Sequence, residues 1–233
     1  MTSVADNLAN IKKLITVYEQ QYGRESGAVQ LLAASKSQPL EKILAAYQAG
    51  QRRFGENYLQ EALKKMSDLA ANHPGVASSI EWHFIGPMQR NKTRKIAEHF
   101  AWVHSVDSDI IAKRLSEQRP AHLPPLNICI EVNISNQATK SGVPLAHVLS
   151  LAKECLTLPR LTLRGLMAIP AFHPDFNQQR QECHQLFLVW QALRDQEIAL
   201  DTLSLGMSSD FEAAIAEGST LVRIGSAIFG QRA

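Results

Sequence analysis

The sequence is poor in cysteine, nearly balanced in charge and free of long apolar runs. Its three cysteines form no CxxC pair, and one would stay unpaired in any disulfide scheme, which is typical of a reducing compartment. The formal charge is only +2, too small to indicate a nucleic-acid or membrane partner. No segment approaches the roughly 18 apolar residues of a membrane span, and the N-terminus lacks a signal peptide's apolar stretch. We therefore expect a soluble, cytoplasmic protein.

Several common enzyme signatures are also missing. The eight histidines never show HxH or HxxxH spacing on one element, and no carboxylate cluster accompanies them, so we expect no metal site. The sequence contains neither GxSxG nor GxxxxGK[ST]. These absences remove the commonest hydrolase and nucleotide-triphosphatase hypotheses.

What the sequence has is a regular alternation of apolar and helical segments. Short apolar runs, typical of buried strands, fall near residues 30–36, 51–55, 81–86, 101–106, 126–134, 161–169, 202–206 and 220–225. Helical patterns lie at 40–49, 58–72, 91–99, 110–118, 145–156, 175–196 and 210–217, and another at 4–22 precedes the first strand.

This alternation predicts an α/β fold with a parallel sheet. Eight units in 233 residues favour a single closed (β/α)8 TIM-type barrel over 1–233, with an extra N-terminal helix. An open flavodoxin-like sheet is the alternative.

A lysine follows the first predicted strand. Lys36 closes the apolar run LLAASK and is followed by the turn residues SQP, which places its amine at the barrel end that carries chemistry. Low-dielectric walls lower the pKa of a lysine amine and so activate it for Schiff-base formation. The alternative is a structural lysine paired with a carboxylate such as Glu56 or Glu81.

The next two strands end beside further polar candidates. Gly55 permits a close backbone approach, and Asn57 in FGENYLQE offers its amide either to a ligand or to the start of a helix as an N-cap. His83 lies within EWHFIGPMQRNK. A lone histidine in a strand is more often a hydrogen-bonded core residue than a catalyst.

Two loops after the seventh and eighth strands have the composition of anion sites. SLGMSSD carries Gly206 and Ser208, and LVRIGSAIFG carries Gly225 and Ser226. Backbone N–H groups at helix starts bind phosphate, and barrels often hold phosphate after these two strands. Asp210 and Glu212 partly oppose this interpretation, because carboxylates there already satisfy the helix dipole.

Arg223 lies in the eighth strand and alternates with Val222 and Ile224, so we expect it to face the barrel interior. A buried arginine needs a partner, either a carboxylate or a ligand acceptor such as a ring nitrogen. An amine, an arginine and two phosphate loops are what pyridoxal 5'-phosphate (PLP) requires. A sugar phosphate or nucleotide would suit the loops equally well, and an aldolase using Lys36 on a sugar phosphate is a further candidate.

The whole chain resembles the pyridoxal phosphate homeostasis protein family, whose barrel is similar to the N-terminal domain of alanine racemase and other fold-type III PLP enzymes. The stretches that carry the resemblance are LLAASKSQP, FGENYLQE, EWHFIGPMQRNK, KSGV, LRGLMAIP and LSLGMSSDFEAAIAEGSTLVRIGSAIFG. The resemblance implies that Lys36 forms a Schiff base with PLP and that Arg223 faces the pyridine nitrogen. It also implies that the phosphate is held by Ser208, Gly225 and Ser226, and that the ring pocket includes Asn57, Ser204, Gly206, Met207, His83, Gly86 and Met167.

The resemblance further implies a function in intracellular PLP (vitamin B6) homeostasis, with indirect effects on amino-acid metabolism and PLP-dependent apoenzymes as candidate recipients. An arginine only donates to the ring nitrogen, which leaves the ring a poor electron sink. Fold-type III racemases and decarboxylases use a second domain and a dimer partner, and this sequence ends just after its eighth unit. We therefore expect a monomeric binding protein and not an enzyme, with a racemase-like enzyme as the competing hypothesis.

Lys140 lies in the loop NQATKSGV after the fifth predicted strand. It is either a solvated loop lysine or a second amine near the barrel mouth that takes part in PLP transfer.

Overall fold

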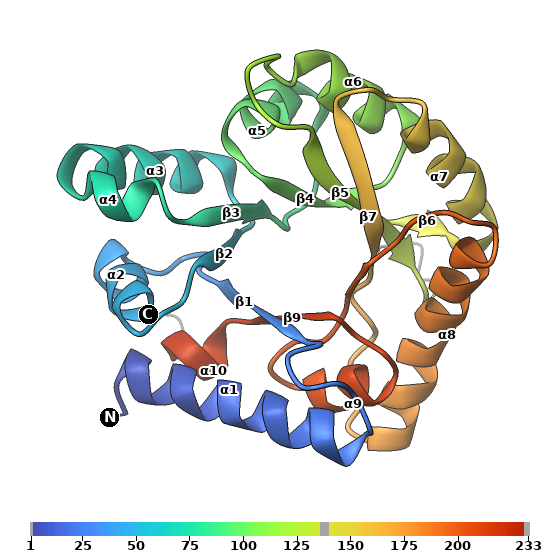
Figure 1. The fold of residues 1–233 in the computed structure, drawn as a ribbon, viewed down its shortest axis with the longest axis horizontal. Coiled ribbons are helices and arrows are strands. Elements are labelled where there is room, and N and C mark those ends of the chain that lie inside the picture. The colour runs from blue at the N-terminus through green and yellow to red at the C-terminus, as the bar shows by residue number, and fades with distance from the viewer. Residues whose placement is uncertain (1, 136–139, 231–233) are drawn as a thin grey trace.

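Eight parallel strands close into a barrel in the computed structural model, which describes residues 2–135 and 140–230 (Figure 1). The strands are β1 (Gln30–Ala34), β2 (Arg53–Glu56), β3 (Glu81–Phe84), β4 (Trp102–Val106), β5 (Leu126–Asn133), β7 (Leu161–Met167), β8 (Thr202–Ser204) and β9 (Leu221–Ile224). They pair in the order β4-β3-β2-β1-β9-β8-β7-β5, and β5 pairs again with β4. This closure confirms the predicted barrel and shows that the open-sheet alternative is wrong. A short strand, β6 (Val143–Pro144), pairs with β5 outside the ring.

Helices lie around the outside of the barrel (Figure 1). They are α1 (Val4–Gln21), α2 (Leu40–Gln48), α3 (Leu59–Asn72), α5 (Thr93–His99), α6 (Asp109–Gln118), α7 (Val148–Leu156), α8 (Phe176–Arg194) and α9 (Phe211–Ala216). Four short pieces were not predicted as elements of their own: α4 (Pro74–Ala77), α10 (Ser226–Phe229), η1 (Arg90–Lys92) and η2 (Leu145–His147). In the described part of the chain, none of the helices combines the length and the apolar character needed to cross a bilayer.

The N-terminal helix α1 is specified by its own sequence. The Ser3 hydroxyl accepts a hydrogen bond from the Asp6 backbone N–H at 3.1 Å, and the Asp6 carboxylate accepts one from the Ser3 backbone N–H. This reciprocal pair satisfies two N–H groups that a helix start leaves without partners. Leu8, Ile11 and Ile15 then follow at helical spacing and are buried, so that α1 packs against α2, α9 and α10 (Figure 1).

Successive side chains along each strand point alternately outward, toward the helices, and inward, into the barrel interior. Outward side chains pack against the helices in one large apolar cluster. Inward side chains form two small apolar groups, which are Leu32, Ile85 and Leu221 in one and Trp102, Cys129 and Met167 in the other. The interior also contains buried polar side chains, namely His83, His104, Ser204 and Arg223. A polar barrel centre is costly unless every group finds a partner, and these groups bind one another.

Candidate functional site

A cavity of about 340 Å³ opens at the carboxyl ends of the barrel strands, within the range of about 300–1,000 Å³ usual for small-molecule sites. Seven of the predicted site residues line it, namely Lys36, Asn57, Met207, Ser208, Arg223, Gly225 and Ser226. They come from β9 and from the segments that follow β1, β2, β8 and β9. Segments far apart in the sequence therefore meet in one place, as the barrel topology predicted.

Lys36 is held at the cavity through the residues on either side of it. Lys65 of α3 donates to the Ser35 carbonyl oxygen at 2.8 Å, and the Glu61 carboxylate accepts from the Ser37 backbone N–H at 2.7 Å. Ser37 has φ 58°, in the left-handed region that costs energy for a residue other than glycine. These contacts fix the turn that presents Lys36.

The carboxylates proposed as alternative partners of Lys36 bind other cations. Glu56 Oε1 accepts from Lys65 Nζ at 2.7 Å, and Glu81 Oε1 accepts from Arg53 Nε at 3.0 Å. Each of these two carboxylates therefore has a cationic partner of its own. The local sequence could not show this, because Lys65 and Arg53 reach these carboxylates only through the tertiary fold.

Arg223 faces the barrel interior, as its strand position predicted, and is 5% exposed. Its Nη1 donates to the Ser204 carbonyl oxygen at 2.7 Å and to the Ser204 hydroxyl at 2.8 Å. Its Nη2 donates to the Ala168 carbonyl oxygen at 2.8 Å. The guanidinium is thus tied to β8 and to the end of β7, and it forms part of the cavity wall.

Asn57 presents a polar atom that the protein leaves unsatisfied. Its Oδ1 is buried and has no hydrogen-bond partner among the described residues. The helix α3 has Tyr58 at its N-cap, so the N-cap alternative for Asn57 is wrong. A Cβ on Gly86 would lie 2.2 Å from the Asn57 carbonyl oxygen. Glycine at position 86 therefore lets the two loops approach and hold Asn57 at the cavity.

The two serine loops meet as expected. The Ser226 and Ser208 hydroxyl oxygens lie 3.2 Å apart, one from each loop. Gly206 has φ 102°, and a Cβ there would lie 2.7 Å from the Ala214 Cβ, so the first loop needs glycine. Asp210 accepts from the Met207 backbone N–H at 2.6 Å, so its carboxylate is used within its own loop.

The other five predicted residues do not line the cavity. Ser204 and Gly206 contact Arg223 directly. The Ser204 hydroxyl accepts from the Arg223 guanidinium. The Gly206 carbonyl oxygen accepts from the Arg223 backbone N–H at 2.9 Å. Met167 is buried with Trp102 in the barrel interior. Gly86 acts on Asn57, as described above. His83 is fully buried and hydrogen-bonded, which confirms the core alternative for this histidine.

Lys140 lies beside the cavity. Its Nζ donates to the Ile169 carbonyl oxygen at 3.0 Å and to the Ser135 hydroxyl at 3.3 Å, and Ile169 itself lines the cavity. The amine is therefore part of the barrel mouth, and its role in transfer stays a prediction.

Sequence reasoning missed several lining residues, namely Ala34, Gln38, Ile85, Ile169, Ser209 and Gly230. Ile85 could have been found, because it comes directly after β3, at the cavity end of the barrel. Gln38 and Gly230 lie in connecting segments that carry no motif, and only the folded chain brings them to the site.

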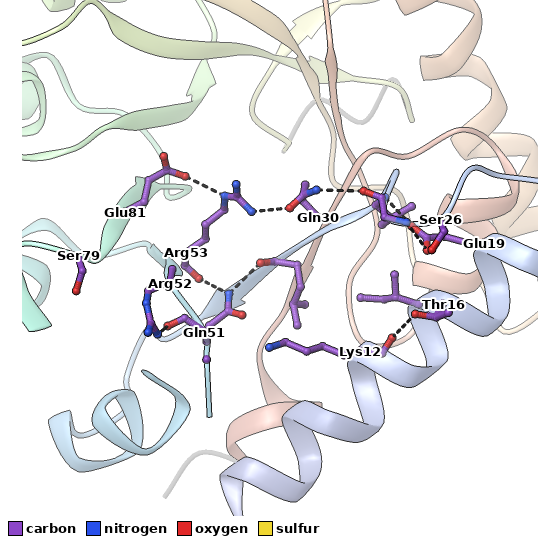
Figure 2. A pocket seen from close by; sticks show the side chains of 15 residues that line it. Lys12, Thr16, Glu19, Ser26, Gln30, Gln51, Arg52, Arg53, Ser79 and Glu81 are labelled. Atoms are coloured by element: carbon purple, nitrogen blue, oxygen red, sulfur yellow. Dashed lines mark hydrogen bonds and ion pairs between the residues drawn. The ribbon is translucent and has the colours of Figure 1, made fainter. Parts of the chain in front are cut away.

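A wider groove of about 690 Å³ lies at the opposite end of the barrel, between α1 and the starts of β1 and β2 (Figure 2). Its arginines already have protein partners. Arg53 donates to Glu81 at 3.0 Å and to Gln30 at 2.6 Å, and Arg52 donates to the Tyr47 carbonyl oxygen at 2.8 Å. Because barrel chemistry belongs to the carboxyl ends of the strands, we interpret this groove as structural.

Glu131 places a titratable carboxyl in the barrel interior. It is 7% exposed and alternates with Ile130 and Val132, which pack in the outer core. Burial, followed by the negative charge of Asp107, raises the pKa of this carboxyl to about 7. The ordinary value in an unfolded chain is about 4.3.

Replacing Glu131 by glutamine is expected to stabilise the protein by about 3–4 kcal/mol at pH 8 and to have little effect near pH 4. Because the folded-state pKa is raised, the native state loses stability as the pH rises from about 4.3 to about 7, and glutamine removes this loss. Urea unfolding at both pH values measures the difference, with exposed Glu117→Gln as the control. An equal gain at both pH values would contradict the prediction.

Comparisons with known proteins agree with one another. The family described as the alanine racemase N-terminal domain matches residues 7–233. A Vibrio cholerae protein named pyridoxal phosphate homeostasis protein is 52% identical over 232 residues, covering 100% of this chain and 98% of the relative. PipY of Synechococcus elongatus with PLP bound is 33% identical, with a TM-score of 0.84 over 98% of this chain and 100% of PipY. Alanine racemase of Corynebacterium glutamicum, 17% identical with a TM-score of 0.67 over 98% of this chain and 61% of that one, shares the fold.

Proposed function

Given that this chain belongs to the pyridoxal phosphate homeostasis protein family, we propose that it binds PLP at the carboxyl ends of β1, β8 and β9 and acts in intracellular PLP homeostasis. The observation that carries the proposal is the meeting of Lys36, Arg223 and the Ser208–Ser226 hydroxyl pair in one cavity. PipY, whose structure contains PLP, supports it. As part of the same proposal, the chain acts in the cytoplasm as a monomer and supplies cofactor to PLP-dependent apoenzymes.

The residues present fit this cofactor. PLP supplies an aldehyde that bonds reversibly to a lysine amine, and Lys36 is the lysine among the lining residues. Asn57 Oδ1, buried without a partner among the described residues, accepts a hydrogen bond from a ligand hydroxyl. Ser208 and Ser226 donate to the phosphate, and Arg223 donates to the ring nitrogen. Each group thus has a complementary atom on the cofactor.

We assign a binding and delivery role, and not catalysis, from the chemistry of Arg223. A guanidinium has donors only and stays protonated, so a ring nitrogen beside it accepts a hydrogen bond and carries no proton. Such a ring withdraws electrons weakly, which disfavours reactions that place negative charge on it. The name homeostasis protein, which the Vibrio cholerae relative carries, agrees with this assignment.

The proposal that the protein does not catalyse reactions of amino acids is tested by deuterium exchange. When the protein is incubated with each of the twenty amino acids in heavy water, we expect no uptake at the α-carbon above that of Lys36→Ala. Lys36-dependent exchange with any amino acid would favour a racemase-like enzyme instead.

Cofactor binding is tested by the absorption spectrum of the purified protein, before and after borohydride, with peptide mapping of the product. We expect a visible band that borohydride removes, and a reduced cofactor fixed to the peptide that contains Lys36. A colourless protein that takes up no added PLP would overturn the proposed function.

The phosphate assignment predicts that Ser208→Ala and Ser226→Ala each weaken PLP binding by about tenfold to a hundredfold, the effect of one hydrogen bond to a charged group. Pyridoxal, which lacks the phosphate, is the matched control ligand and should bind all three proteins equally. Titration of the apoprotein followed by absorbance measures both affinities. Parallel losses for pyridoxal and PLP would show that the serines support the site's shape and do not bind the phosphate.

A further inference from the structure

A continuous chain of side-chain hydrogen bonds runs through the barrel interior from Arg223 to Glu81. Arg223 Nη1 lies 2.8 Å from Ser204 Oγ, which lies 2.8 Å from His104 Nδ1. His104 Nε2 lies 2.9 Å from His83 Nδ1, and His83 Nε2 lies 3.0 Å from Glu81 Oε1. Four strands contribute: β9, β8, β4 and β3. The cavity wall is thus connected to the opposite end of the barrel, where Glu81 also binds Arg53 (Figure 2).

The two ends of this chain have fixed and opposite hydrogen-bonding character. Arg223 is a guanidinium and only donates. Glu81 is ionised near neutral pH, because the hydrogen bond from His83 lowers the pKa of its carboxyl to about 2, and it only accepts. Burial lowers the pKa of His83 and His104, so each ring is neutral and carries one proton.

These constraints leave one arrangement of protons. The ionised Glu81 carboxylate only accepts, so His83 carries its proton on Nε2 and leaves Nδ1 as an acceptor. His104 then carries its proton on Nε2, donates to His83 Nδ1 and leaves its own Nδ1 as an acceptor. Ser204 therefore donates its hydroxyl proton to His104 Nδ1 and accepts from Arg223. The chain cannot reverse, because the Glu81 carboxylate has no proton to donate. It is therefore not a proton path, and every one of its groups is held in a single orientation.

We propose that Ser204, His104 and His83 are positioning residues that orient the Arg223 guanidinium toward the cofactor's ring nitrogen, with Glu81 as the anionic anchor. Each link polarises the next, so the charge of Glu81 strengthens the Ser204 hydroxyl as an acceptor for Arg223. His83 is also fixed by stacking on Trp102, with ring centroids 5.3 Å apart. This inference rests on the proposed function.

The experiment uses the full chain without cofactor and labels its histidines with 15N. Long-range 15N–1H spectra report which ring nitrogen carries the proton. We expect His104 and His83 both to be protonated at Nε2 and unprotonated at Nδ1, from pH 7 to pH 8. Protonation of either ring at Nδ1 in the wild-type protein would overturn the proposal. This measurement needs no PLP, so it is independent of the proposed function.

Two matched variants test the link to Arg223. Ser204→Ala removes the hydroxyl but keeps the carbonyl oxygen that also binds Arg223, and Ser204→Thr keeps the hydroxyl. We expect Ser204→Ala to shift the 15N resonance of His104 Nδ1, which loses its hydrogen-bond donor, to shift the absorption band of the lysine-bound cofactor and to weaken PLP binding by about tenfold. Ser204→Thr should restore all three properties.

The outcomes separate the two proposals. If Ser204→Ala matches the wild-type protein in the His104 Nδ1 resonance, absorption band and PLP affinity, the positioning chain is overturned while PLP binding stands. If the wild-type protein takes up no PLP, the proposed function fails, and the histidine spectra of the cofactor-free variants still decide the chain. Far-ultraviolet circular dichroism and urea unfolding confirm that each variant is folded.

Discussion

Lys36→Ala is expected to lose all covalent attachment of PLP and to keep the fold. Lys36 is the one lysine among the described residues that line the cavity, and imine formation requires an amine. The remaining hydrogen-bonding groups should retain weaker, non-covalent binding, since each such bond contributes a factor of about ten. Borohydride reduction followed by mass spectrometry of the intact protein measures the covalent fraction.

The matched control for this prediction is Lys140→Ala. Lys140 is the amine at the barrel mouth, where it binds the Ile169 carbonyl oxygen, and its removal should leave the adduct on Lys36. An adduct of wild-type yield in Lys36→Ala would show that another amine bonds the cofactor. Loss of the adduct in Lys140→Ala alone would point to Lys140 as that amine.

The barrel was predictable because its signal is local. Eight apolar runs alternate with amphipathic segments, and each predicted strand overlaps one observed strand. The elements not predicted include α4, α10 and β6, which have four, four and two residues. Segments this short carry no periodic pattern, since one helical turn needs 3.6 residues.

The site was predictable in part, where function requires particular residue types in particular segments. A lysine after a buried strand and glycine–serine loops before helices indicate their chemistry by themselves. The partners of the buried charged side chains could not be predicted from residue type and local sequence in this way. Arg223 meets Ser204 across 19 positions, and His104 meets Ser204 across 100, because neighbouring and facing strands bring them together. His83 was therefore recognisable as a core histidine, but its link to Arg223 was not.

Replacing Lys65 by methionine is expected to cost the protein a large part of its folding stability. Lys65 and Glu56 are both buried, Lys65 Nζ lies 2.7 Å from Glu56 Oε1, and Glu56 Oε2 has no hydrogen-bond partner among the described residues. Lys65→Met would leave the Glu56 charge buried, with the Ser35 hydroxyl still donating to it. Removing one partner of a buried ion pair costs about 3–5 kcal/mol, a large share of a total stability of about 5–15 kcal/mol.

Urea unfolding of Lys65→Met measures this loss of stability directly. The control is Lys64→Met, which replaces the neighbouring lysine. Lys64 pairs with Asp68 on the exposed face of α3, with 77% of its side chain exposed, and such a pair contributes about 0–1 kcal/mol. Burial already raises the pKa of Glu56, and without Lys65 that pKa rises further. The loss should therefore be larger at pH 8, where the carboxyl must ionise, than at pH 5. Glu56→Gln added to Lys65→Met should recover part of the stability, because it removes the unpaired charge. If the two lysine variants lose the same stability, the buried pair does not make the contribution predicted for it.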